Sequence, residues 1–127
     1  MDLGIAGRRA LVCGASRGLG RGCAGALAGE GVTVVLNGRD AGRLEAAAAA
    51  LTATGARVVQ APGDVTTEAG RAAVLAVAGQ VDILVTNAAG PPPGTWGDAD
   101  LDAIRAAVEA NLVAPVALMR AVLPGMM

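Results

Sequence analysis

The chain has 127 residues, of which 54% are hydrophobic, and a formal net charge of −1. This length is enough for one domain with a buried core. The ten basic residues, all arginine, are scattered, and Trp96 is the only aromatic residue. Nucleic acid is therefore not expected as the main partner. The chain has no histidine, which excludes a Cys/His metal site, and we expect no bound metal.

Neither a membrane span nor a signal peptide is expected from the sequence. The uncharged stretch over residues 110–119 is about half of the ~20 residues that a span needs. The apolar stretch over residues 83–97 is interrupted by three prolines, and the first residues lack a signal-peptide pattern. Cys13 and Cys23 form no CxxC pair, and we interpret both as small buried hydrophobic residues. Two free thiols favour a reducing, cytoplasmic location.

Four short apolar runs, roughly 25 residues apart, alternate with segments of helical spacing. The runs are continuous rather than alternating, as in strands that are covered on both faces. We predict strands at residues 10–12, 32–36, 58–59 and 83–85. We predict helices over residues 18–29, over 40–55 with Asp40 as N-cap, over 66–79, and from Asp98 onward. The expected packing face of the first helix comprises Leu19, Cys23, Ala26 and Leu27.

This alternation predicts right-handed βαβ units and therefore an α/β fold. We expect a Rossmann-type, doubly wound parallel sheet with strand order 3-2-1-4, in a single domain over residues 1–127. Ligands of such sheets bind beyond the carboxyl ends of the strands, at the point where the strand order reverses. The turns after the first and the fourth strand both fall there.

The first strand leads into a glycine-rich turn that reads Cys13-Gly14-Ala15-Ser16-Arg17-Gly18-Leu19-Gly20. Three glycines at a strand-to-helix turn let the backbone pass close to a phosphate, and the helix N-terminus adds free N–H groups and a positive dipole end. We therefore predict a site for the pyrophosphate of a dinucleotide. Its expected residues are Gly14, Ser16, Arg17, Gly18, Leu19 and Gly20.

The segment after the second strand indicates which dinucleotide binds. A site that prefers NAD usually carries Asp or Glu there, which accepts hydrogen bonds from the adenosine ribose. Here the segment reads Leu36-Asn37-Gly38-Arg39, so the acidic position is filled by Asn or Gly. Arg39, together with Arg17, suits a 2′-phosphate, which Arg binds in bidentate fashion. We predict NADP(H) over NAD(H). The alternative is that both arginines are ordinary solvated charges.

The last helix carries a proline and a long apolar run. Pro115 lies four residues after Asn111 and has no N–H, so it cannot bond the Asn111 carbonyl as a normal helical residue would. The alternative is that Pro115 only kinks the helix. Residues 112–123 are apolar on almost every side except at Arg120. A helix of this kind must be covered on more than one side.

The glycine turn, Asp64-Val65, the run from Asp82 to Ala88 and Asn111 together resemble the short-chain dehydrogenase/reductase family over nearly the whole chain. The likeness is greatest to members similar to 3-oxoacyl-[acyl-carrier-protein] reductase. It implies an NADP(H)-dependent oxidoreductase that transfers hydride between the cofactor and a small carbonyl or alcohol, 3-oxoacyl thioesters included. It also implies a homo-oligomer formed through the last helix, although the core of one larger subunit would give the same apolar pattern.

The resemblance assigns roles to single residues. Asp64 and Val65 correspond to the pair that contacts the adenine ring, although Asp64 is equally well placed to stabilise a turn before Thr66. Asn87 and Ala88 correspond to residues beside the nicotinamide ribose. Asn111 corresponds to a catalytic residue whose backbone carbonyl holds a water in a proton relay. Three positions depart from the family pattern: Cys13, Thr86 and Ala89 stand where Thr, Asn and Gly are usual.

The family's catalytic Ser, Tyr and Lys lie on a fifth strand and the helix after it, and this chain contains neither Tyr nor Lys. We therefore expect an N-terminal part of a longer protein, truncated after the fourth strand and the long helix that follows, and inactive alone as a reductase. The alternative is a non-catalytic dinucleotide-binding module or pseudoenzyme. A third interpretation is an unrelated doubly wound protein such as a methyltransferase.

Overall fold

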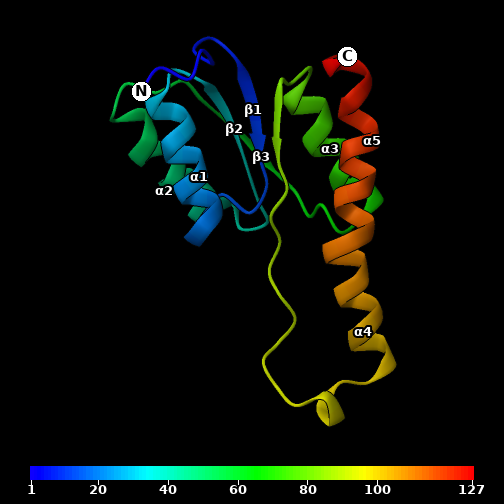
Figure 1. The fold of residues 1–127 in the computed structure, drawn as a ribbon. Coiled ribbons are helices and arrows are strands. Elements are labelled where there is room, and N and C mark those ends of the chain that lie inside the picture. Colours follow the sequence, from blue (N-terminus) through cyan, green and yellow to red (C-terminus); the bar gives the residue numbers. More distant parts are fainter.

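The computed structural model describes all 127 residues. Strands and helices alternate along the chain and are followed by a long helical run (Figure 1). The alternating elements are β1 (Arg9–Val12), α1 (Gly18–Gly29), β2 (Thr33–Gly38), α2 (Ala41–Thr52), β3 (Val58–Pro62), α3 (Glu68–Ala78) and β4 (Ile83–Val85). An extended loop then leads to a short 3₁₀ helix, η1 (Trp96–Asp98), to α4 (Leu101–Val108), to the π-helical segment η2 (Glu109–Val113) and to α5 (Ala114–Met126).

The four strands form one parallel sheet in the order β3-β2-β1-β4, which confirms the predicted topology. Leu11 of β1 is in register with Val35 of β2 on one side and with Leu84 of β4 on the other. Helices α1 and α2 lie against one face of the sheet, and α3 and α5 lie against the other (Figure 1). The chain therefore has the doubly wound, Rossmann-type arrangement that the sequence predicts.

Each face of the sheet has its own hydrophobic core. Val12 and Leu36 pack with Leu44 and other side chains of α1 and α2, whereas Leu11 and Val35 pack with residues of α3 and α5. Successive residues of one strand thus enter opposite cores, because side chains alternate across a strand. Burial on both faces is the reason that the strand sequences are continuously apolar.

Local capping sets the helix boundaries. Asp40 caps α2, since its Oδ1 accepts a hydrogen bond of 3.0 Å from the Arg43 N–H, as predicted. Helix α3 begins after Thr67, whose hydroxyl accepts a hydrogen bond of 3.0 Å from the Gly70 N–H. The helix expected from Asp98 begins only at Leu101, because Asp98 instead closes a 3₁₀ turn with Thr95.

The predicted packing face of α1 is confirmed at Leu27, which packs against the core, and is wrong at Leu19, Cys23 and Ala26, which are exposed. Gly20 and Ala24 are buried against the sheet instead. Their small size lets the first turns of α1 approach the sheet closely. The expectation of two buried cysteines holds for Cys13 and is wrong for Cys23.

Residues 101–126 form one helical run of 26 residues that contains an 18-residue window with a mean hydropathy of 1.5, so the run is long and apolar enough to cross a membrane. The expectation that no segment has this length and character is therefore wrong, because η2 joins α4 and α5 into one continuous rod. Length and composition do not by themselves distinguish a span from a helix that packs on protein. Ala114, Leu118 and Val122 are buried in this run.

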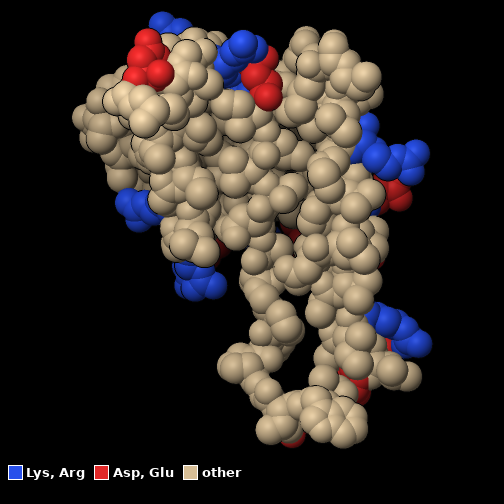
Figure 2. Space-filling model, in the orientation of Figure 1, with Lys and Arg blue, Asp and Glu red and all other residues tan.

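The other side of this run is exposed and mostly apolar. In Figure 2 the long loop is largely free of charged atoms, whereas charged groups project from the outer side of the rod. Several large apolar side chains of the rod are each at least 40% exposed: Leu101, Ile104, Val108, Leu112, Val113, Val116, Met119 and Leu123. In the isolated chain, the sheet and α3 cover only one side of the rod.

Candidate functional site

The glycine-rich turn presents an open helix N-terminus at the carboxyl end of β1. Gly14 and Gly18 have φ values of +58° and +60°, a left-handed conformation that other residues rarely adopt. Arg17 occupies the N-cap position of α1 with an extended backbone and no capping hydrogen bond from its side chain, and the first turn contains no acidic residue. The first N–H groups of α1 are therefore available to an anion.

Gly20, the third glycine, allows close contact between α1, the turn after β1 and the turn after β4. A Cβ on Gly20 would collide with the Gly14 carbonyl and would lie 2.9 Å from Nδ2 of Asn87. A Cβ on Gly14 would lie 2.7 Å from the same nitrogen. Asn87 follows β4, and its Nδ2 donates a hydrogen bond of 3.4 Å to the Gly14 carbonyl. The turns after β1 and β4 thus meet at one edge of the sheet, as predicted.

Asn37, at the end of β2, ties the second and third strands together. It is 2% exposed, and its Nδ2 donates hydrogen bonds of 3.0 Å to the carbonyls of Ala61 and Gly63. Its own carbonyl accepts a hydrogen bond of 2.8 Å from the Ala15 N–H of the glycine-rich turn. A carboxylate has no donor and could not make the two side-chain contacts. The side chain of Asn37 is thus used within the sheet, and of the two residues that the sequence offers for the acidic position, Asn37 and Gly38, it is not the one free to contact a ribose.

The predicted cationic residues flank the same edge. Arg17 and Arg39 are both exposed, and neither belongs to any of the four ion pairs of the chain. Hydrogen bonds from Thr66 are the main cause of the lowered pKa of Asp64, and the positive charge of Arg39 adds to it. Ser16 is half-buried, and its side chain lies against Gly38 at the end of β2. Leu19 points outward from the first turn of α1.

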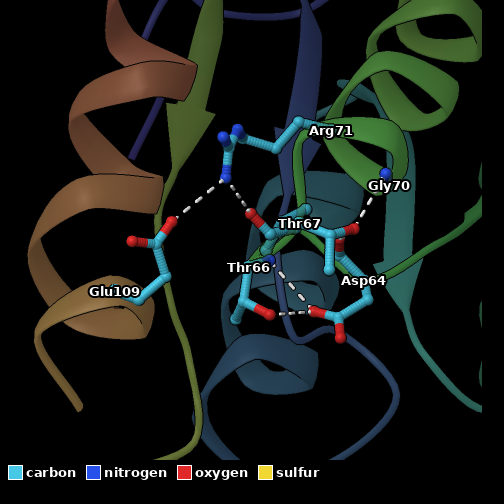
Figure 3. Close-up of polar contacts among 7 residues, drawn as sticks. Asp64, Thr66, Thr67, Gly70, Arg71 and Glu109 are labelled. Atoms are coloured by element: carbon cyan, nitrogen blue, oxygen red, sulfur yellow. Dashed lines mark hydrogen bonds and ion pairs between the residues drawn. The ribbon is translucent and has the colours of Figure 1, made fainter. Parts of the chain in front are cut away.

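Asp64 organises the turn between β3 and α3. Its Oδ1 accepts hydrogen bonds from the Thr66 hydroxyl at 2.6 Å and from the Thr66 N–H at 2.9 Å (Figure 3). These contacts, the hydroxyl first, lower the pKa of Asp64, and they place its side chain in the turn-stabilising role that the sequence left open. Val65 follows, and its carbonyl accepts a hydrogen bond of 3.0 Å from Arg71.

Asn111 lies in the π-helical segment η2. Its Nδ2 donates a hydrogen bond of 3.0 Å to the Ala107 carbonyl, so the side chain is used within the helix. The Ala114 N–H donates to the carbonyl of Glu109, and Pro115 has no N–H to offer to the carbonyl of Asn111. The π-helical register was not predicted; it and the proline both shift carbonyls of this segment away from their ordinary donors.

A cavity of about 10 Å³ marks the place where these parts converge. Residues from β1, from the turn after β3, from the turn after β4 and from the helical rod line it, among them Cys13, Val65, Asn87, Ala88 and Pro115. Burial raises the pKa of the Cys13 thiol to about 11, so this sulfur stays protonated at neutral pH. No cluster of three or more His, Cys, Asp or Glu side chains could hold a metal ion.

A sequence profile described as short chain dehydrogenase matches residues 8–127 of the chain. The chain belongs to the short-chain dehydrogenase family. The ketoacyl reductase HetN of a Nostoc species is 35% identical over 127 residues, which cover 97% of this chain and 44% of that protein. Gluconate 5-dehydrogenase of Gluconobacter oxydans is 44% identical over 88 residues, which cover 66% of this chain and 34% of the other.

Solved structures of the family share the fold in detail. L-Sorbose reductase from Gluconobacter frateurii, complexed with NADPH and L-sorbose, superposes with a TM-score of 0.92 at 37% identity, covering 99% of this chain and 50% of that one. A 3-oxoacyl (acyl-carrier-protein) reductase from Agrobacterium tumefaciens with NADP bound gives a TM-score of 0.87 at 31% identity, covering 96% and 48%. The chain thus spans about half the length of these short-chain dehydrogenases.

In this family member, the structure brings most of the predicted site residues to one edge and supplies two that the sequence did not reveal. The glycine-rich turn, Asn87 and the turn at Asp64 all lie at the carboxyl ends of the strands. Asn37 and Arg71 were missed. The only sequence signal for Asn37 is its place at the end of an apolar strand. A polar residue there is expected to be buried and hydrogen-bonded. Nothing in the local sequence singles out Arg71.

Proposed function

We propose that the chain binds NADP(H) at the carboxyl edge of its sheet and forms the cofactor-binding half of a short-chain oxidoreductase. The contact of Gly14, Gly20 and Asn87 carries this proposal, because it holds the glycine backbone beside an uncapped helix N-terminus. The bound nicotinamide would supply hydride transfer with a small carbonyl or alcohol, a substrate class that includes 3-oxoacyl thioesters. This chain's own residues bind and orient the cofactor.

A titration with NADPH tests the proposal directly. Gly20→Ala places a methyl group against the Gly14 carbonyl and should abolish binding measured by calorimetry. Gly22→Ala is the matched control, because it lies in the same helix with no atom within 4 Å of the added Cβ. The proposed site would be contradicted if Gly20→Ala bound NADPH as well as the parent chain does. It would also be contradicted if the folded parent chain did not bind NADPH.

The preference for NADP(H) rests on two arginines without ion-pair partners. Arg17 lies in the glycine-rich turn and Arg39 directly after β2, and the neighbouring reductases with bound NADPH and NADP support the same cofactor. Arg39→Asp should weaken NADPH binding by about tenfold or more and NADH binding much less, since a charge-assisted contact to the 2′-phosphate is lost. Arg57→Asp, at an exposed position just before β3, is the control. Equal losses for both nucleotides would count against this assignment.

Asn111 is proposed as the catalytic residue that acts through its backbone carbonyl, holding a water for proton transfer in the complete active site. Support comes from the π-helical register and from Pro115, both of which disturb the ordinary helical bonding of this segment. Asp64 and Val65 are proposed to lie against the adenine, and Asn87 and Ala88 beside the nicotinamide ribose. The alternative is that residues 1–127 form a non-catalytic dinucleotide-binding module. NADPH would then bind to the chain, but no other part of the protein would supply catalytic residues.

We also propose that the apolar side of the rod binds a second copy of the chain. Leu112, Val116 and Met119 are exposed along one stretch of this rod and would be covered by the same residues of the partner. Val116→Glu should shift the sedimentation of the chain from dimer to monomer, whereas Arg120→Glu, also exposed, should not. A parent chain that is monomeric, or that binds lipid vesicles through this helix instead, would overturn this interface.

A cytoplasmic location is also part of the proposal, and it is supported by the two free thiols.

A further inference from the structure

Arg71, in α3, joins two parts of the candidate site that lie far apart in the sequence. Its side chain is only 15% exposed. Its Nη1 donates a hydrogen bond of 3.0 Å to the Val65 carbonyl and lies 3.9 Å from Oε1 of Glu109. Figure 3 shows both contacts leaving the same nitrogen. One contact reaches the turn between β3 and α3, and the other reaches the first residue of η2.

The ion pair with Arg71 is made by the side chain of Glu109, which is the first residue of the π-helical segment η2. The Glu109 carbonyl accepts the N–H of Ala114, and Asn111 lies between these two residues. The other contact of Arg71 is to Val65 in the β3–α3 turn. Val65 lines the small cavity together with Ala110, which belongs to η2. The turn and η2 thus line one cavity together and are linked through one guanidinium group.

We propose that Arg71 is a positioning residue that couples the β3–α3 turn to η2, so that a nucleotide resting on the turn restrains the segment that carries Asn111. The proposal rests on the proposed function, because it requires an adenine at Asp64 and Val65. A nucleotide there limits the motion of the Val65 carbonyl, and the guanidinium bonded to that carbonyl is restrained with it. The ion pair passes this restraint to Glu109. Coupling of this kind is a free-energy link between sites and needs no large displacement.

Hydrogen–deuterium exchange with 2′,5′-ADP tests the coupling in the complete 127-residue chain. This probe carries the adenosine and both phosphates but lacks the nicotinamide, so in the proposed pose it does not reach η2. In the parent chain at saturation, we expect amide exchange over residues 109–116 to slow by about fivefold. In Arg71→Leu the probe should still protect the glycine-rich turn, while the slowing over 109–116 is lost. Arg71→Lys, which keeps one cationic donor, should retain part of the slowing.

Two further variants separate coupling from a purely structural role. Glu109→Gln removes only the exposed end of the link and should also abolish the slowing. Arg105→Leu, whose Nη1 lies 3.2 Å from Asp102 in an exposed pair within α4, should leave it unchanged. A structural role alone would speed exchange in the free Arg71→Leu chain and preserve the ligand-dependent slowing, which would overturn the proposal. Probe-dependent protection of residues 14–20 without any slowing over 109–116 in the parent would overturn the coupling alone. No protection anywhere would overturn the proposed function and the coupling together.

Discussion

Replacement of Asn37 by aspartate changes a single nitrogen to oxygen and should destabilise the fold in a pH-dependent manner. The amide of Asn37 donates two hydrogen bonds of 3.0 Å from a position that is 2% exposed. Loss of the two bonds removes about 2 kcal/mol, and a buried carboxylate facing two carbonyl oxygens adds roughly 2–3 kcal/mol. The sum of about 4–5 kcal/mol is a large part of the 5–15 kcal/mol that stabilises a typical domain.

The pH dependence follows from the raised pKa that burial imposes on the new carboxyl group in the folded state. The folded Asn37→Asp chain binds its proton more tightly than the unfolded chain, whose aspartate titrates near 3.9. Below that pH the neutral acid can still donate one hydrogen bond and the cost should fall to about 1–2 kcal/mol. Stability is then lost as the pH rises toward the folded-state pKa.

Urea denaturation followed by far-ultraviolet circular dichroism, at pH 4 and at pH 8, measures this difference against the parent chain. Gln60→Glu is the matched control, because it makes the same amide-to-acid change at an exposed position of β3 in register with Leu36. Its effect should stay within about 0.5 kcal/mol. Equal and pH-independent effects of the two substitutions would refute the role of Asn37 as a buried hydrogen-bond donor to the carbonyls of Ala61 and Gly63.

Three other predictions concern the same edge of the sheet. The lowered pKa of Asp64 means that its contribution to stability is present above the unfolded value near 3.9 and is lost as the pH falls through the folded value, so Asp64→Asn should flatten the acid limb of thermal melts recorded from pH 3 to 6. Pro115→Ala offers an N–H to the segment at Asn111, and nuclear magnetic resonance should find the new amide protected from exchange; a rapidly exchanging amide would argue against a carbonyl in need of a donor. A thiol reagent at pH 7 should modify exposed Cys23 within minutes and leave buried Cys13 unmodified until the chain unfolds, whereas equal rates would contradict the burial of Cys13.

The sequence predicted the sheet and the edge at which the turns after β1 and β4 meet, because both follow from short-range patterns. The four apolar runs became β1 to β4 in the expected order, and Asp40 capped α2 as expected. The glycine-rich turn and Asn87 met at one edge because parallel strands carry their carboxyl ends together. These features depend on residue type and spacing alone.

Other features depend on partners that the local sequence does not reveal. The role of Asn37 is set by carbonyls of β3, and the role of Arg71 by Val65 and by Glu109. The packing face of α1 was predicted correctly at Leu27 but not in the first turns, where Gly20 and Ala24 are buried in place of Leu19 and Cys23. Apolar spacing does not distinguish a π-helical turn from an α-helical one, so η2 was also missed.

The fixed contact among Gly14, Gly20 and Asn87 has a consequence for the thermodynamics of association. Donor groups that already point in the required direction lose little conformational freedom when an anion arrives, so the entropic penalty of complex formation is small. The glycine-rich turn should therefore keep nearly the same shape with and without its ligand. Affinity at this end of the molecule would then come from preorganisation, while any larger rearrangement would be confined to the extended loop after β4.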